Sequence, residues 1–130
     1  MTSSVATVSV LVRDYDAARD WYVGKLGFTL VEDRDMGDGK RWVVVAPPGD
    51  RGARLLLAKA VKPDEVAQVG HQAGGRVFLF LVTDNFARDH AAMTARGVRF
   101  LEEPRHETYG SVAVFEDFCG NKWDLIQPAG

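Results

Sequence analysis

LVRDYDAARDWYVGKLGFTLVED, residues 11–33, decides the fold, because its pattern returns 70 residues later. The second copy, LVTDNFARDHAAMTARGVRFLEE, spans residues 81–103 and aligns with the first without a gap. The identical pairs are Leu11/Leu81, Val12/Val82, Asp14/Asp84, Ala17/Ala87, Gly27/Gly97 and Glu32/Glu102. Each pair falls where a structural role can be named, so the chain is interpreted as an internal repeat of two modules.

Each copy predicts a helix that follows a strand. An apolar run ends at Asp14 in the first copy and at Asp84 in the second, and a carboxylate there can accept bonds from the free N–H groups of the helix that follows. Apolar residues then recur at the three-to-four spacing of a buried stripe. Gly27 and Gly97 are expected to end the two helices.

Short strands are predicted after each helix, separated by turn residues. In the first module they cover residues 28–35, 41–46 and 53–60, and in the second 98–106, 111–116 and 122–127. Each module thus has the order βαβββ. The predicted boundaries are 1–61 for the first module, 62–75 for a linker and 76–130 for the second, all within a single domain.

Several strands are apolar on both faces, among them VSVLV, WVVVA, LLLA and VFLFLV. A sheet with one wet face alternates polar and apolar residues instead. One face is therefore expected to cover a helix and the other to face a hollow, which predicts an α+β fold of two cupped mixed sheets. One short chain would struggle to cover so much apolar surface, and this favours a homodimer.

The amino-acid composition limits which classes of binding partner are expected. The net charge is −2 with Lys and Arg scattered among acids, which argues against nucleic acid. The longest apolar runs are too short to cross a bilayer, so no membrane is expected as a partner. The single cysteine, Cys119, excludes an internal disulfide and fits a cytoplasmic protein.

The first copy, together with VFEDFCGNKWDLIQP at residues 114–128, resembles the vicinal oxygen chelate superfamily of glyoxalase I, extradiol dioxygenases and bleomycin-resistance proteins. The likeness covers essentially the whole chain and is closest to the short two-module members. It implies the glyoxalase/bleomycin resistance fold, and it implies a homodimer in which modules of two chains often complete each other's cups.

In the metal-dependent families the resemblance implies a divalent ion held at four positions, which map onto Thr7, Leu56, Val77 and Asp124. Leu56 and Val77 have no donor atom, and the Thr7 hydroxyl is a poor ligand for ions that need three or more carboxylate or imidazole donors. We therefore expect no metal and no cofactor. Ligands from His71, His90 or His106 remain the alternative.

The resemblance then points to the metal-free branch, whose members include drug-sequestering proteins that bind a small molecule in an apolar cup. The alternative is an enzyme of the same superfamily. It would be a lyase or dioxygenase with non-standard metal ligands, or a cofactor-free isomerase that uses Asp124 or His106 as acid or base.

Strand alternation predicts which side chains line the hollow. The side chains expected to face the hollow, besides those at the four mapped positions, are Ser9, Leu11, Arg54, Ala58, Leu79 and Leu81. Those expected to face the helices are Val8, Leu55, Phe78, Phe80 and Trp123. Trp42 is a candidate for stacking on a flat ligand, with core packing or a dimer contact as the alternative. The predicted ligand-binding residues are Thr7, Trp42, Arg54, Leu56, Val77, Leu79, Tyr109 and Asp124.

Asp124 lies among apolar neighbours, so its pKa should be raised unless it is paired, for example with Arg54. It is interpreted as a hydrogen-bonding anchor, a general base or a structural acid. EEPRHETYG, residues 102–110, is expected to form a hairpin loop at the mouth of the second cup. In that loop His106 is a candidate acid or base, and the loop is a candidate lid.

Overall fold

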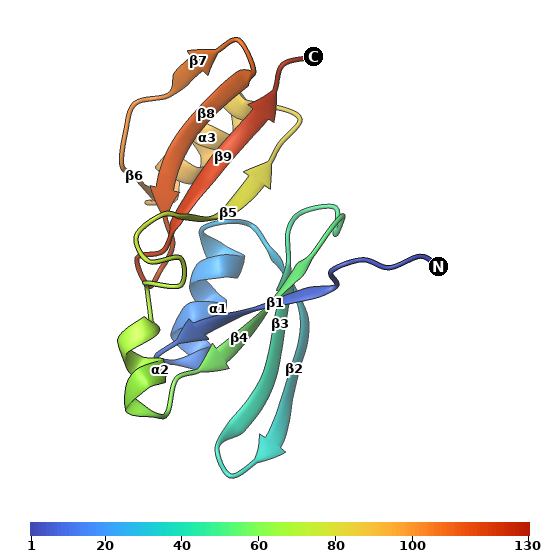
Figure 1. The fold of residues 1–130 in the computed structure, drawn as a ribbon, viewed down its shortest axis with the longest axis vertical. Coiled ribbons are helices and arrows are strands. Elements are labelled where there is room, and N and C mark those ends of the chain that lie inside the picture. Colours follow the sequence, from blue (N-terminus) through green and yellow to red (C-terminus); the bar gives the residue numbers. More distant parts are fainter. The chain divides into compact units, whose positions relative to one another are not determined.

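The computed structural model describes residues 1–130, and the chain divides into two compact units, Met1–Val69 and Gly70–Gly130. Each unit has one mixed sheet, with two helices in the first unit and one in the second (Figure 1). The boundary between the units falls inside the segment 62–75 that was expected to link two modules. No helix of the chain is both long enough and apolar enough to span a membrane.

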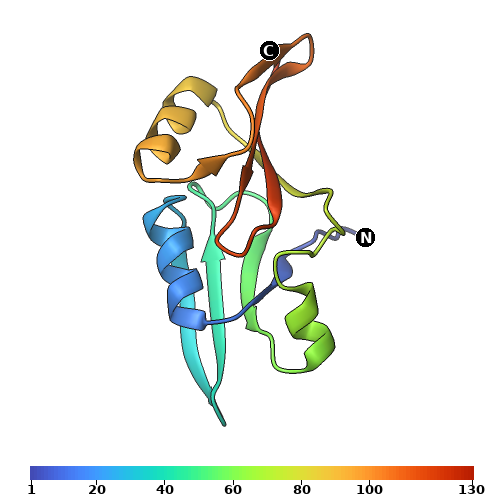
Figure 2. The same ribbon diagram turned by 90° about the vertical axis from the view of Figure 1, so that its left-hand side faces the viewer.

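The first unit is a βαβββ unit followed by a short helix. Its sheet has the strand order β1-β4-β3-β2, with β1 parallel to β4 and the other neighbours antiparallel. Helix α1 lies along one face of this sheet (Figure 2). The elements are β1 (Thr7–Val12), α1 (Tyr15–Gly24), β2 (Thr29–Gly37), β3 (Lys40–Ala46), β4 (Arg54–Lys59) and α2 (Pro63–Gln68).

The second unit repeats the βαβββ order with one of its strands divided in two, and its sheet has the equivalent strand order β5-β9-β8-β6. Strand β5 is parallel to β9, and a further short strand, β7, pairs with β8. The elements are β5 (Val77–Val82), α3 (Phe86–Ala95), β6 (Arg99–Phe100), β7 (Arg105–Glu107), β8 (Gly110–Glu116) and β9 (Lys122–Pro128). The α+β fold with two mixed sheets is thus confirmed.

The core of each unit lies between its helix and one face of its sheet. In the first unit, α1 buries Tyr15, Ala18 and Tyr22 over strand residues such as Val43 and Leu57, both fully buried. In the second unit, α3 buries Phe86 and Met93, and the facing strand residues are Ala113, Phe115, Trp123 and Leu125. The apolar periods read from the sequence therefore mark the faces that pack together.

The helix starts agree with the sequence in one unit and differ by one residue in the other. Asp14 caps α1, and its Oδ2 accepts a bond from the backbone N–H of Ala17 at 2.8 Å, as predicted. In α3 the cap is Asn85, whose Oδ1 accepts from the Arg88 N–H at 3.1 Å, so the prediction of Asp84 is wrong. Asn and Asp are equally good caps, and Asp84 instead pairs with the Arg88 side chain.

The single strand predicted over residues 98–106 is also wrong, because the structure has two short strands there. β6 ends at Phe100 and β7 begins at Arg105, and Pro104, which has no N–H to donate, lies between them. At the interruption Glu102 Oε1 accepts the backbone N–H of Val114 at 3.1 Å. A side chain thus replaces a backbone partner of β8, which brings a carboxylate to this edge of the sheet.

Candidate functional site

The face of the second sheet that points away from α3 contains the acid singled out from the sequence. Asp124 in β9 is opposite Val114 in β8 and Phe80 in β5. Residues paired across a sheet share a face, and neighbours along a strand point to opposite faces. Trp123 and Leu125 therefore face α3, whereas Asp124 lies on the opposite face.

Asp124 has an unsatisfied carboxyl group. Its Oδ1 is buried and has no hydrogen-bond partner. Burial raises the pKa of the Asp124 carboxyl above its ordinary value, while the charge of Arg105 lowers it and that of Glu102 raises it by smaller amounts. The raised pKa expected for Asp124 is confirmed.

A charged group adjoins this face at the strand interruption. Arg105 Nε donates to both carboxylate oxygens of Glu102 at 3.1 Å, and its Nη1 donates to Tyr109 Oη at 3.3 Å. Arg105 is opposite Val112, which is opposite Ile126, so its side chain belongs to the same face as Asp124. Arg105 thus bonds Tyr109 directly and acts on Asp124 only through its charge.

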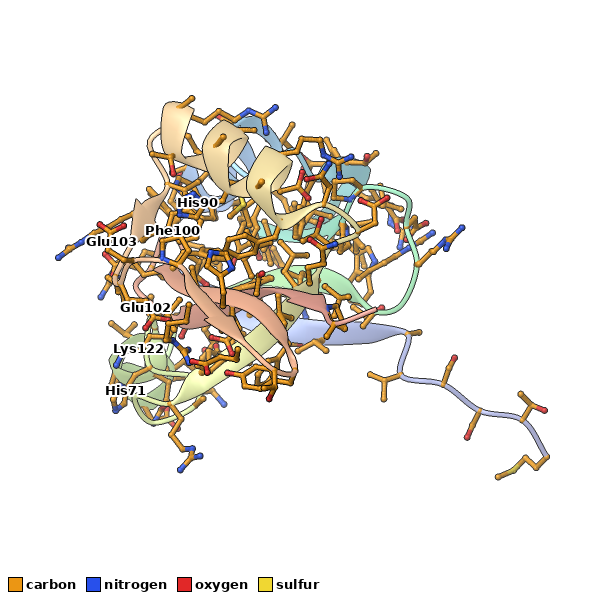
Figure 3. The ribbon with its side chains drawn as sticks, turned by 90° about the horizontal axis from the view of Figure 1, so that it is seen from above. His71, His90, Phe100, Glu102, Glu103 and Lys122 are labelled. Atoms are coloured by element: carbon orange, nitrogen blue, oxygen red, sulfur yellow. The ribbon has the colours of Figure 1, made fainter.

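An open depression of about 310 Å³ lies on this face beside Val114, and Asp124 itself is not part of its lining. Its lining is mostly apolar and carries one acidic and one basic side chain. In Figure 3 both charged residues, Glu102 and Lys122, lie on the side of the sheet away from α3. Val114 of the lining is the direct cross-strand neighbour of Asp124. The lining residues are Gly75, Val77, Leu101, Glu102, Val114 and Lys122.

The orientations predicted for β5 are only partly correct. Val77 is opposite Lys122 and so shares the face of Asp124, as expected. The register then shifts between Val77 and Leu79, so that Leu79 is opposite Trp123 and Leu81 is opposite Leu125. A bulge of one residue moves every later side chain to the other face. Leu79 and Leu81 therefore lie on the α3 face.

The same shift places two apolar side chains on the face of Asp124. Phe80 is opposite Asp124 and Val82 is opposite Ile126. Both are largely exposed, at 63 % and 64 %. Sequence reasoning assigned Phe80 to the helix side, because no Gly or Pro within β5 marks the bulge.

In the first unit the predicted orientations hold along the whole β1–β4 ladder. Thr7 is opposite Arg54, Ser9 is opposite Leu56 and Leu11 is opposite Ala58, without a register shift. These residues share the face away from α1, because Leu55 and Leu57 between them are buried in the core.

Two further predicted residues lie on that face of the first unit. Trp42 belongs to it because Val44, two residues along β3, is opposite Leu56. Arg54 pairs with Asp50, and the shortest distance, from Nη2 to Oδ2, is 2.7 Å. Arg54 was considered from the sequence as an ion-pair partner of Asp124, but in the structure it pairs with Asp50 of its own unit.

His106 lies on the opposite side of the second sheet from Asp124. It is opposite Ser111, and its Nδ1 is 2.9 Å from Ser111 Oγ. Its ring contacts the edge of Phe86 in α3, at 6.3 Å between centroids. His90 and Phe100 contact each other on the α3 side as well, with their rings tilted and 4.3 Å between ring centroids (Figure 3). Residues 105–110 form the expected hairpin, and within it His106 faces the helix.

Asp117, which sequence reasoning did not single out, organises the turn between β8 and β9. Its Oδ1 accepts the backbone N–H groups of Cys119, Gly120 and Asn121, each at 3.0 Å. Its Oδ2 accepts Asn121 Nδ2 at 3.0 Å and Trp123 Nε1 at 3.1 Å. The acid is only 5 % exposed and is matched to five donors. The DFCGN pattern therefore sets the direction in which β9 leaves the turn, and with it the face on which Asp124 lies.

The donor chemistry does not fit a divalent ion at the four mapped positions. Only Asp124 has a carboxylate, and the hydroxyl of Thr7 is the one other side-chain oxygen. No group of three or more His, Cys, Asp or Glu side chains lies close enough to hold an ion anywhere in residues 1–130. The histidines considered as alternatives therefore do not form a ligand set with Asp124.

Comparison with known proteins places these features in a family. The sequence pattern of the Glyoxalase/Bleomycin resistance protein/Dioxygenase superfamily matches residues 4–125. An uncharacterized protein of Shewanella frigidimarina is 52% identical over 128 residues, which cover 98% of this chain and 95% of that protein.

Two solved structures share both the fold and part of the sequence. The crystal structure of UcmS2 aligns with a TM-score of 0.84 and 28% identity, covering 97% of this chain and 98% of that one. TnmS3, an antibiotic binding protein from Streptomyces sp. CB03234, aligns with a TM-score of 0.78 and 34% identity, covering 98% of both chains.

Proposed function

Since this chain belongs to the Glyoxalase/Bleomycin resistance protein/Dioxygenase superfamily, we propose that it binds a small, largely apolar molecule without a metal ion. Asp124 is the hydrogen-bonding anchor of that molecule. The ligand lies on the face of the second sheet away from α3, over the depression beside Val114.

The observation that carries this proposal is the buried Oδ1 of Asp124 with no partner. An unmatched buried acceptor costs about 1–3 kcal/mol, and a ligand N–H or O–H could pair with it once the half-buried Asp124 carboxyl turns that oxygen toward the open face. A mostly apolar surface with a few polar anchors is the usual composition of a small-molecule site. A hydrogen bond from a ligand would therefore explain why the protein has an acid at position 124, although this acid destabilises the free protein.

The likeness to TnmS3 supports a ligand of the antibiotic type. That protein is an antibiotic binding protein, and it aligns over nearly the whole of both chains. The glyoxalase and dioxygenase activities of the superfamily are less well supported here, because the mapped positions offer a metal ion a single carboxylate.

Elemental analysis of protein purified without chelator tests the metal-free part of the proposal. We expect zinc, iron, nickel and manganese far below one ion per chain. Near-stoichiometric content of any of them, retained after gel filtration, would disprove it.

A thermal-shift screen against aromatic antibiotics and metabolites tests binding. A ligand that binds only the folded state raises the melting temperature in proportion to ln(1 + [L]/Kd), so the shift should grow with concentration. Asp124→Asn should reduce the shift for the best ligand, with Asp50→Asn, an acid of the first unit, as the control. A panel in which no compound moves the melting temperature would count against the proposal.

The raised pKa of Asp124 favours one second candidate, a cofactor-free isomerase in which this carboxyl moves a proton. His106 is not its partner, because it faces α3. Loss of turnover in Asp124→Asn, with ligand affinity retained, would favour the enzyme. Loss of affinity in a protein without turnover would favour the binding function.

We also propose that the working form is a homodimer. The exposed apolar side chains of β5 support this, since isolated large apolar patches are seldom left open in a monomer. Sedimentation equilibrium at micromolar concentration should give twice the chain mass of 14.3 kDa, and a single-chain mass would refute the proposal.

A further inference from the structure

We infer that Lys122 is a specificity-determining residue and that the ligand of the depression is an apolar carboxylic acid. This inference rests on the proposed function and adds the chemical class of the ligand to it. Its basis is the position of Lys122, a lysine without an ion-pair partner in the lining of a mostly apolar depression.

Strand pairing places Lys122 on the face that contains the depression. It is opposite Glu116 in β8 and opposite Val77 in β5, and Val77 also belongs to the lining. The lysine stem is long and flexible, and its methylene groups can lie along apolar surface while the ammonium group stays free to bind. Lys122 can therefore reach a molecule that occupies the depression.

The acids around Lys122 are already bonded to other groups. Glu102, the other charged residue of the lining, accepts Arg105 Nε with both carboxylate oxygens, each at 3.1 Å (Figure 3). Glu116 accepts Arg99 Nη1 at 3.2 Å, although it is the cross-strand neighbour of Lys122. The ammonium group of Lys122 thus keeps its three N–H donors without a protein carboxylate to accept them.

Asp124, two residues along β9 on the same face, also leaves Lys122 unpaired. Burial raises the pKa of the Asp124 carboxyl and so disfavours the negative charge that could neutralise the lysine. A ligand carboxylate can supply that charge, and one ammonium group matches its single charge. The apolar body of the ligand would then contact Val77, Leu101 and Val114.

Three probes with the same chain test this selection, because octanoate, octanamide and octylamine differ in the charge of their head groups. Dissociation constants are measured by ligand-observed NMR for the full-length wild-type protein and for Lys122→Met, Lys122→Arg and Lys59→Met. Methionine keeps an unbranched apolar side chain without the charge, whereas arginine keeps the charge. Lys59 is the matched control, because it is an exposed lysine in β4, the strand of the first unit that corresponds to β9.

Wild-type protein is expected to bind octanoate about three- to fivefold more tightly than octanamide, and octylamine most weakly. Lys122→Met should raise the Kd for octanoate by the same factor and leave that for octanamide unchanged, which also shows that the variant is folded. Lys122→Arg should keep the preference, and Lys59→Met should change nothing. Raising the salt concentration from about 0.05 M to about 0.5 M should weaken octanoate binding alone, because salt screens the charge of the ligand.

Equal wild-type affinities for octanoate and octanamide would overturn the inference and leave the proposed function intact, as would a preference for octanoate that survives in Lys122→Met. The same holds if the wild-type protein ignores octanoate yet is stabilised by a compound of the thermal-shift panel. If neither octanoate nor any compound of the panel binds, the proposed function fails and the selectivity of Lys122 fails with it.

Discussion

Two acids seven residues apart in VFEDFCGNKWDLIQP show how differently a buried carboxyl group can be accommodated. Asp117 receives five hydrogen bonds from the turn that it organises. Asp124 keeps one buried oxygen without a partner. A buried carboxylate whose oxygens all accept hydrogen bonds stabilises the fold. A buried oxygen without a donor lowers stability, so a functional reason for its presence is expected.

Asp117→Asn should therefore destabilise the protein strongly. The new NH2 group cannot accept the bonds now made by Asn121 Nδ2 and Trp123 Nε1, and two buried donors would lose their partner. We expect a loss on the order of 3 kcal/mol in the free energy of unfolding, measured by urea denaturation. Asp50→Asn, in the equivalent turn of the first unit, should have a far smaller effect because Asp50 makes an exposed ion pair.

Asp124→Asn should change stability in a pH-dependent way. Burial raises the pKa of Asp124 in the folded state above the ordinary value of 3.8. Below pH 3.8 both states bind the proton and the carboxyl has no ionisation cost. As the pH rises, the unfolded chain loses its proton first, so wild-type stability declines until the pH exceeds the folded pKa.

Asparagine does not titrate, so the stability of Asp124→Asn relative to wild type should rise between acid and neutral pH. Urea denaturation of both proteins across this range measures the difference. A difference that stays constant with pH would mean that Asp124 titrates alike in both states.

At the scale of elements, the sequence predicted what local patterns determine. Apolar spacing indicated the faces of α1 and α3. The absence of polar alternation predicted two-sided burial, which β3 shows along residues 43–46, whereas β5 leaves Phe80 and Val82 largely exposed. The bulge in β5 escaped prediction because pairing to β9, rather than the VFLFLV sequence, sets the register there. The break between β6 and β7 had a visible signal in Pro104, which a continuous strand would not accommodate.

The wrong prediction of Asp84 as the cap of α3 can be tested quantitatively. Asn85 accepts the Arg88 N–H, whereas Asp84 makes only an exposed ion pair. Asn85→Ala should lower the free energy of unfolding by about 1 kcal/mol, since it removes the cap. Asp84→Ala should have a clearly smaller effect. An Asp84→Ala loss that equals or exceeds that of Asn85→Ala would show that the predicted cap was the energetically important one.

At the scale of the whole molecule, the two units have equivalent strand orders, but the sheet faces that point away from their helices carry different side chains. The β1–β4 ladder runs in register and places Leu56 where the second unit has Asp124, and Arg54 there is neutralised by Asp50. The second unit has the bulge, the unpartnered acid and the Glu102–Arg105 pair. The repeat was predictable because helices and turns need the same residues twice. The division of roles was not, because it depends on register and on long-range partners.

The first residues of the second unit are held against the turn between β8 and β9. Gln72 N donates to Asn121 Oδ1 at 3.0 Å, and Gly70 packs against the β8–β9 turn. A Cβ on Gly70 would lie 2.0 Å from the carbonyl oxygen of Cys119, and Gly70 has a φ of 75°. Gly74, at a φ of 64°, has open space around the same position.

Alanine at these two glycines should consequently have unequal effects. Gly74→Ala carries only the strain of a left-handed backbone, about 1–2 kcal/mol. Gly70→Ala adds a collision with backbone that must shift the turn built around Asp117, for a total of about 2–4 kcal/mol. Urea denaturation of both variants measures the difference, and tryptophan fluorescence reports on Trp123, which is bonded to Asp117. Equal losses would mean that Gly70 does not pack against the β8–β9 turn, contrary to the contacts seen at Gly70 and Gln72.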